Sequence, residues 1–439
     1  MKFKIKEENG SSFIMYEHTE STGKALTLED IYINNKKYFK YTKVAAKIDN
    51  VLRPMWWEIE GDCKIEFIDV RNHGGNLIYQ SSVVMIFLKA MYDINPDVKV
   101  IVDNALNKGL YIKLSKNIDL TETLVEEIKN KMSAIVDEDK TIYKEVNDNK
   151  KTYSLDGFCA SFCSELVPST GYIDMFDLEK YEMGLLLKTP DPDNPLEIPH
   201  GRDEKHMYMA FKERDKWQKL LGIINAEQLN QRIKAGEYSR LIQLSEALHE
   251  SKIIEIAKEI IEKKKRIVLI AGPSSSGKTT FAQKLCIQLM VRGIKPVYLG
   301  TDDYFINRED TPFDEEGNRD FESLVAVDIE LFNEQMNDLL NGQVVDVPVY
   351  DFMKGEKVFG TRLTKLEEGQ PIIIEGIHGL NDALTSKIDE KEKYRIYISP
   401  LTGLNLDEYN RISTTDERLL RRIVRDNMRR GRSAEETIL

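Results

Sequence analysis

The chain has 439 residues, which predicts roughly two to three domains. Its formal net charge of −12 argues against a generally basic nucleic-acid surface and leaves only a local basic patch open. Its four cysteines are too few for a disulfide framework in a chain of this length, and we interpret Cys159 and Cys163 as reduced thiols rather than as a metal site. The first residues lack the apolar core of a signal peptide and no apolar run is long enough to span a bilayer, so we expect a cytoplasmic protein without a membrane partner.

The first half of the chain carries strand and helix patterns that are typical of an α+β module. Alternating residues at 2–6, 12–16 and 64–69 predict a small, mostly β domain over 1–70. A turn at 73–76 is expected before a largely buried helix at 81–92. A strand pair at 98–102 and 109–114 is joined through a turn at 107–109. An amphipathic helix at 120–136 and an exposed, proline-rich loop at 189–200 complete a second predicted domain over 71–235.

A change of pattern begins near residue 236. Apolar residues at helical spacing over 241–266 predict a helix that connects the two halves across 236–265, and its basic end suits the negative pole of a helix better than a nucleic-acid contact. Strand patterns at 267–271, 296–300, 344–350, 371–375 and 394–398 then alternate with helical patterns. This alternation predicts an α/β domain over 266–439, in which helices flank a parallel sheet.

The strongest indication of chemistry lies between the first of these strands and the helix that follows it. Gly272 and Gly277 bracket four residues and precede Lys278 and Thr279, which gives G-x-x-x-x-G-K-S/T in the strand–helix context that the motif requires. In such a loop, backbone N–H groups surround a phosphate, the lysine reaches the β- and γ-phosphates, and the threonine hydroxyl binds Mg²⁺. A ligand-free glycine-rich turn is the alternative. The predicted nucleotide-binding residues are Gly272, Pro273, Ser274, Ser275, Ser276, Gly277, Lys278, Thr279 and Thr280.

Acidic residues follow two other predicted strands of the same domain. Asp302 and Asp303 come after the strand at 296–300, where a carboxylate could take a proton from an attacking hydroxyl or help to hold Mg²⁺. A pair of aspartates in a polar loop is the alternative. Glu375 ends the apolar run at 371–375, the place of an acid that holds Mg²⁺ directly or through water. We therefore predict Thr279 and Glu375 as metal-binding residues.

An arginine-rich helix is predicted near the C-terminus. Residues 416–432 hold seven arginines and three acids, and a stripe at helical spacing is formed by Arg418, Arg421, Arg422, Arg425 and Arg429. Guanidinium groups suit phosphate oxygens, so this helix could close over a nucleotide. RNA binding and a solvated charged face are the competing interpretations.

Several motifs in order resemble the P-loop uridine kinase/phosphoribulokinase family over about 266–439: the loop at 272–279, the boxes at 302–305, 348–352 and 374–377, and the arginine-rich segment. The resemblance implies transfer of the γ-phosphoryl group of ATP, with Mg²⁺, to a hydroxyl of a uridine-like nucleoside or of a sugar phosphate. It implies Asp302 as the base, with Lys278 and Arg425 as the other catalytic residues. The implied acceptor-binding residues are Asp303, Tyr304, Glu322, Tyr350, Arg418 and Arg422.

The chain departs from the family pattern on the acceptor side. Uridine kinases usually carry a histidine shortly after the Tyr-Asp-Phe box, where this chain reads Met-Lys-Gly-Glu at 353–356. The aspartate of their Phe-Asp-His-Pro box is Glu322 here, and Asp303 stands where these enzymes often have serine. The acceptor and the choice between the two aspartates as base therefore stay open.

Residues 1–185 resemble the TGS and second additional (editing) domains of threonyl-tRNA synthetases, most clearly at Val-Pro-Ser-Thr-Gly over 167–171. The helix from Tyr79 stands where that family carries a His-x-x-x-His pair, and Leu166 stands where another editing histidine is expected, so the resemblance implies a fold without metal binding or deacylation. The alternative function is an RNA-binding or regulatory P-loop ATPase whose first module binds tRNA-like RNA, although the first half shows no basic stripe.

The last residues carry a helix-start pattern. Ser433 and Glu436 have capping-box spacing, and no stop residue follows before Leu439. Because the resembled family continues to a further strand and helix, we expect the P-loop domain to be truncated at its C-terminus.

Overall fold

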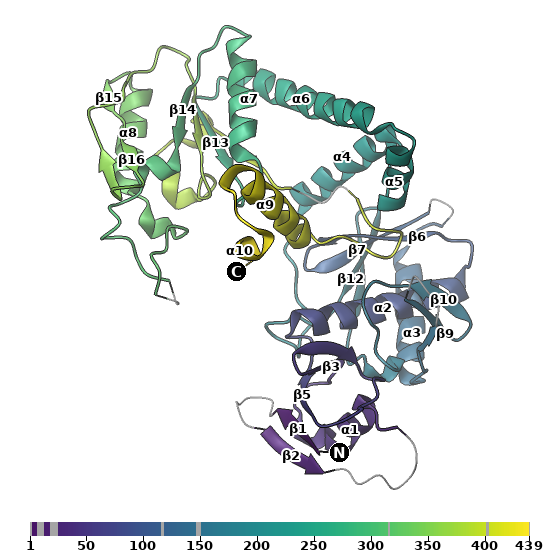
Figure 1. The fold of residues 1–439 in the computed structure, drawn as a ribbon. Coiled ribbons are helices and arrows are strands. Elements are labelled where there is room, and N and C mark those ends of the chain that lie inside the picture. The colour runs from purple at the N-terminus through teal and green to yellow at the C-terminus, as the bar shows by residue number, and fades with distance from the viewer. Residues whose placement is uncertain are drawn as a thin grey trace. The chain divides into compact units, whose positions relative to one another are not determined.

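The computed structural model describes residues 2–6, 13–17, 25–115, 118–145, 151–314, 317–400 and 404–438. These residues form two compact units (Figure 1). The first unit comprises Met1–Gln231 together with Leu404–Ile412, and the second comprises Arg232–Gly403 together with Ser413–Leu439. The chain thus enters the first unit a second time, through Leu404–Ile412, which we call the return segment.

The first unit begins with a mixed sheet in the order β2-β1-β5-β3-β4. Its strands are β1 (Lys2–Lys6), β2 (Phe13–Glu17), β3 (Ala45–Ile48), β4 (Val51–Pro54) and β5 (Cys63–Ile68). Helix α1 (Leu28–Asn35) starts at a capping box of Thr27 and Asp30, and its buried face shares one core with Ile5, Ile65 and Phe67. The predicted β strands are present here, two of them shifted by one residue.

The centre of the first unit is the apolar helix α2 (His73–Ile94), which shares a core with α3 (Glu122–Asp137). The same core takes in an antiparallel sheet in the order β11-β12-β7-β6, made of β6 (Val100–Leu106), β7 (Gly109–Leu114), β11 (Asp177–Tyr181) and β12 (Gly184–Lys188). A smaller sheet is made of β8 (Tyr143–Glu145), β9 (Thr152–Leu155) and β10 (Phe158–Ser161). Among the described residues, α2 alone has the length and apolar composition to cross a membrane, and 67% of its apolar window is buried inside the protein.

The expected turn at 73–76 is wrong, because these residues form the first turn of α2. Asn72 caps the helix, and its side chain accepts a hydrogen bond from Gly74 N at 3.0 Å. A Cβ on Gly75 would lie 2.1 Å from Asp69 O, so this glycine lets the helix start against the end of β5. The predicted hairpin turn is confirmed: Asn107 and Lys108 both have positive φ, as a two-residue hairpin of this kind requires.

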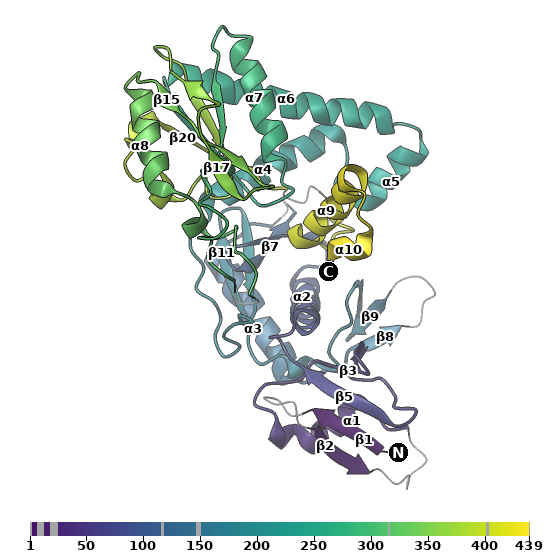
Figure 2. The ribbon, with the colours of Figure 1, turned by 60° about the vertical axis from the view of Figure 1, so that its left-hand side comes forward.

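The second unit is built on a parallel sheet in the order β14-β19-β13-β20. The strands are β13 (Ile267–Ala271), β14 (Val297–Gly300), β19 (Ile372–Glu375) and β20 (Lys393–Tyr397). Helices α6 (Tyr238–Glu262) and α7 (Lys278–Met290) pack on the face that includes Val268, and α8 (Ile329–Leu340) packs on the face that includes Leu269 (Figures 1 and 2). The predicted α/β domain with a parallel sheet is confirmed, and the connecting helix is part of its core.

The strand expected at 344–350 does not belong to this sheet. It divides into β15 (Val345–Asp346), which pairs with β18 (Leu363–Thr364), and β16 (Val349–Asp351), which pairs with β17 (Glu356–Val358), both antiparallel. Pro348 lies between the two pieces, and a residue without an N–H group cannot continue the ladder of a central strand. The prediction of a strand of the parallel sheet at 344–350 is therefore wrong, although the run contains buried residues.

The remaining helices are α4 (Lys205–Leu221), α5 (Ala226–Lys234), α9 (Thr414–Arg430) and α10 (Ala434–Ile438). Gly431 ends α9 with φ 65°. The capping box before α10 is confirmed: Ser433 N donates to Glu436 Oε2 at 2.7 Å, and Glu436 N donates to Ser433 Oγ at 3.2 Å.

Candidate active site

The loop between β13 and α7 has the backbone geometry that its glycines predict. Gly277 precedes α7 with φ 97°, and a Cβ on Gly272 would lie 2.0 Å from Ile398 O, the residue after β20. Both positions therefore need glycine, one for its conformation and one for the close approach of a neighbouring strand end. Lys278 is the first residue of the helix, and its Nζ donates to Pro273 O at 3.3 Å across the loop.

The same loop offers unused hydrogen-bonding groups of the kind a phosphate needs. The hydroxyl oxygens of Ser275 and Ser276 are buried, and the described residues give neither of them a partner. The first N–H groups of α7 add to these donors, because a helix N-terminus leaves its first amides without intrahelical partners. A phosphate group fits this set of donors and the charge of Lys278.

The two predicted metal-binding residues lie together. Thr279 Oγ1 donates to Glu375 Oε2 at 3.0 Å, because α7 starts directly beside the carboxyl end of β19. Tyr298 donates its hydroxyl to the same carboxylate oxygen at 2.7 Å, and burial together with Glu375 raises the pKa of Tyr298. Tyr298 is a site residue that the sequence reasoning missed.

Asp302 and Asp303 follow β14 in a short 3₁₀ turn and differ in their surroundings. Asp303 pairs with Arg362, whose guanidinium lies 2.8 Å from Asp303 Oδ2. Partial desolvation and the nearby Glu375 carboxylate raise the pKa of Asp302, although Lys278 and a hydrogen bond from Thr301 oppose this. Asp302 is exposed and interacts electrostatically with Glu375 and Lys278, whereas Asp303 is paired with a cation.

Aromatic rings gather beyond these aspartates. The ring of Phe305 lies 5.7 Å from that of Tyr350, and Tyr350 lies 5.0 Å from Phe352. Tyr350 is buried, and its hydroxyl has no hydrogen-bond partner among the described residues. Glu322 is exposed in the preceding loop.

The prediction that Tyr304 binds the acceptor is wrong. Its side chain is fully buried, its hydroxyl donates to Gln335 Oε1 at 2.9 Å, and its ring packs edge-on against Phe332. The Tyr304 side chain lies in the core between the sheet and α8. The sequence of the box alone does not reveal this.

The arginine helix α9 reaches the phosphate loop through Arg421, whose Nε donates to Ser275 O at 3.4 Å. Arg425 instead pairs with its buried neighbour Asp426 at 2.7 Å, and Arg422 lies 3.8 Å from the same carboxylate. The Nε of Arg418 is buried without a partner among the described residues. The side chain of Arg429 lies outside the described residues.

Comparison with known proteins matches the second unit. The profile of the Phosphoribulokinase / Uridine kinase family covers residues 267–438. The uridine kinase of Ligilactobacillus salivarius is 33% identical over 178 residues, which is 40% of this chain and 74% of that protein. The uridine kinase of Mycoplasma genitalium is 30% identical over the same length, with the same coverage.

A solved structure of a "Possible Uridine Kinase" from Bacillus stearothermophilus is 25% identical in sequence, and the match covers 34% of this chain and 79% of that protein. The TM-score is 0.28, too low to indicate a shared fold. The sequence relatives carry the assignment, because each is matched over nearly three quarters of its length. The chain therefore belongs to the phosphoribulokinase/uridine kinase family and is a phosphotransferase that uses a hydroxyl group as acceptor.

Proposed function

We propose that the protein is a kinase that uses ATP and Mg²⁺ to phosphorylate a hydroxyl of a uridine-like nucleoside or of a sugar phosphate. The observation that supports this most is the meeting of Thr279, Glu375 and Asp302 beside Lys278 at the carboxyl edge of a parallel sheet. In sheets of this type, ligands bind at that edge.

Residues 272–280 bind the phosphates through backbone N–H groups, the Ser275 and Ser276 hydroxyls and the charge of Lys278. Lys278 exchanges its long bond to Pro273 O for a phosphate oxygen, which presents a full negative charge. Thr279 and Glu375 hold the metal. Bound there, Mg²⁺ supplies positive charge that neutralises the phosphate oxygens.

Asp302 acts as the general base. Its carboxylate takes the proton of the acceptor hydroxyl as that oxygen forms its bond to phosphorus and the bond to the leaving phosphate breaks. Asp303 stays paired with Arg362 and positions the acceptor side of the site. A raised pKa makes the Asp302 carboxylate a better proton acceptor than an ordinary aspartate.

Arg421 is the α9 arginine that we assign to the transferring phosphoryl group, because it already contacts the loop that holds the phosphates. Arg425, proposed from the sequence for this role, binds the buried Asp426 and holds the helix in place. Arg418, Arg422 and Glu322 remain proposed acceptor contacts. Phe305 and Tyr350 are buried, and their rings support the exposed ring of Phe352, on which a flat acceptor ring would stack; this favours a nucleoside over a sugar phosphate.

For the first unit we propose a TGS-like domain over 1–70 and a synthetase-like domain over 71–235 that has no editing chemistry. The helix stretch at 79–84, where that family carries a His-x-x-x-His pair, holds no histidine, and its Tyr79, Val83 and Val84 are buried in the core. The Tyr79 hydroxyl donates to Met175 O at 2.7 Å and accepts from Met175 N at 3.0 Å, so it holds the fold together.

A substrate panel tests the proposed function. Nucleosides and sugar phosphates are incubated with ATP and Mg²⁺, and ADP release and product mass are measured. We expect one acceptor class to gain one phosphoryl group, with no reaction when EDTA is present. ADP release that is independent of every acceptor would support a regulatory ATPase instead.

A further inference from the structure

A cavity lies in the first unit, and none of the residues proposed for the kinase reaction lines it. It has a volume of about 270 Å³. Its walls come from helix α2, the β6–β7 turn, the loop after β12 and the return segment. The apolar part includes Ala105, Leu110 and Leu187, together with three prolines of the 189–200 loop. A cavity of this kind, apolar with few polar groups, is the ordinary form of a small-molecule site.

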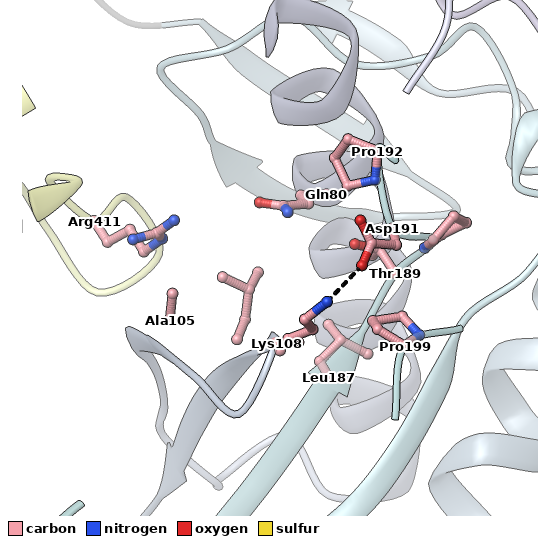
Figure 3. A pocket seen from close by; sticks show the side chains of 12 residues that line it. Gln80, Ala105, Lys108, Leu187, Thr189, Asp191, Pro192, Pro199 and Arg411 are labelled. Carbon is pink, nitrogen blue, oxygen red and sulfur yellow. Dashed lines mark hydrogen bonds and ion pairs between the residues drawn. The ribbon is translucent and has the colours of Figure 1, made fainter. Parts of the chain in front are cut away.

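The charged residues of the lining are Lys108, Asp191 and Arg411. Lys108 Nζ lies 2.8 Å from Asp191 Oδ2. Each partner keeps the other charged, since the ion pair raises the pKa of Lys108 and lowers the pKa of Asp191. In Figure 3, the Arg411 guanidinium and the Gln80 amide extend toward one another, and the Lys108–Asp191 pair lies beyond them.

The loops that carry these groups are held before any ligand arrives. Asp191 Oδ1 accepts from Asp193 N, and the loop closes on itself through Asn194 N to Asp191 O at 3.0 Å. Asn107, beside Lys108, donates its N–H to Glu204 Oε2 at 2.7 Å. Asn410, beside Arg411, accepts from Cys163 N at 2.8 Å and donates to Ser161 O at 2.9 Å. A site whose walls are already ordered loses less entropy on binding.

We propose that this cavity binds a small organic carboxylate, with the carboxylate at Arg411 and Gln80 and the apolar body against Leu110, Leu187 and the prolines. A guanidinium group has N–H donors in the arrangement that suits the two oxygens of a carboxylate. The site belongs to the first unit alone, so it is independent of the proposed kinase mechanism.

The test uses sodium acetate, butyrate and benzoate as probes, with the corresponding neutral amides as controls and NaCl to equalise ionic strength. Binding to the full-length protein is measured by calorimetry. We expect saturable binding of at least one carboxylate and weaker binding of its amide. Arg411→Gln should weaken carboxylate binding about tenfold, as the loss of a charge-assisted hydrogen bond does.

Two further variants keep the test decisive. Ala105→Phe should fill the cavity and abolish binding, and it serves also if Arg411→Gln does not fold. Lys180→Gln removes an exposed positive charge of the same unit that does not line the cavity, and it should bind as the wild type does. Equal affinity for a carboxylate and its amide, no saturable binding of any carboxylate, or full binding by Ala105→Phe would each overturn the proposal.

Discussion

At the scale of single residues, Asp302 and Asp303 have identical side chains but different surroundings, which suit them to different roles. Asp303 has a guanidinium partner at 2.8 Å. Asp302 has the Glu375 carboxylate as a neighbour and is partly desolvated, and both effects favour its protonated form. A base should be free to accept a proton, and a carboxylate bound to arginine is a poor one.

Asp302→Asn should lower kcat about 10²- to 10⁴-fold with little change in ATP affinity, because a general base acts on the chemical step. Because its pKa is raised, the acid limb of the wild-type kcat/KM profile should lie above the ordinary aspartate value of about 3.9, and activity should fall as the pH drops through it. A larger loss of kcat in Asp303→Asn would identify Asp303 as the base instead.

The same substitution should raise the melting temperature at neutral pH. A carboxyl group with a raised folded-state pKa contributes stability below its unfolded pKa and loses it as the pH rises through the folded one, so the ionised Asp302 destabilises the fold at pH 7. Asparagine removes that charge. The difference between the two proteins in thermal unfolding should vanish in acid.

Lys278→Ala should lower turnover about 10²- to 10³-fold, the usual cost of removing one preorganised positive group at a developing charge. Circular dichroism and melting temperature should match the wild type, because the Lys278 ammonium makes one long bond within its own loop. Lys284→Ala changes a half-exposed lysine later in α7, whose Nζ lies 3.5 Å from Glu250 Oε2, and this matched control should keep full activity. Equal activity of both variants would remove Lys278 from the mechanism.

At the scale of elements, α9 divides its arginines between two tasks. Arg421 contacts the phosphate loop, while Arg425 pairs with Asp426, which is fully buried. Removing Arg425 takes the nearer arginine from the buried Asp426 carboxylate, which keeps Arg422 at 3.8 Å, so the loss of stability is up to about 3 kcal/mol.

Arg421→Gln should therefore lower kcat while the melting temperature stays unchanged, and Arg425→Gln should lower the melting temperature first. Kinetics and thermal unfolding of both variants in parallel separate the two tasks. A normal melting temperature with strongly reduced kcat in Arg425→Gln would return the catalytic role to Arg425.

The sequence predicted those elements whose residues are buried along their whole length. Ile267 and Leu269 face α8 while Val268 and Ile270 face α6 and α7, so β13 was evident from an apolar run. The run at 344–350 is also rich in valine, but it contains Asp346 and Pro348 and divides at Pro348 into two short strands, whose partner strands lie later in the chain. Composition records burial and does not record which strand pairs with which.

The residues of the candidate site also differ in how far the sequence predicts them. Lys278, Thr279 and Glu375 were predictable because a strand–loop–helix motif fixes their local geometry. Tyr298 and Arg362 were not, because their partners Glu375 and Asp303 lie 77 and 59 residues away in the sequence. Tyr304 was misassigned because a motif does not say which side chain of a turn faces the core.

At the scale of the whole molecule, a unit of the phosphoribulokinase/uridine kinase family is joined to a unit for which we propose a synthetase-like fold without metal binding. Among the described residues, no group of three or more His, Cys, Asp and Glu side chains could hold a metal ion, and zinc needs three or four such ligands. Purified protein should contain far less than one zinc per chain by mass spectrometry and should not deacylate mischarged tRNA. Stoichiometric zinc would contradict this, and Cys159, Cys163, His200 and His206 would be the ligands to mutate.

The return segment also governs when the first unit can be finished during synthesis. Val102 sits on the edge strand β6, where its N–H donates to Glu408 O at 2.8 Å and its carbonyl accepts from Asn405 Nδ2 at 3.0 Å. These partners leave the ribosome only after every strand of the parallel sheet has been made. A nascent chain that stops before residue 404 holds a first unit with an open edge, which is a site for mispairing with other chains. The N-terminal unit, although first in order of translation, is therefore closed only after all strands of the parallel sheet in the second unit have been made.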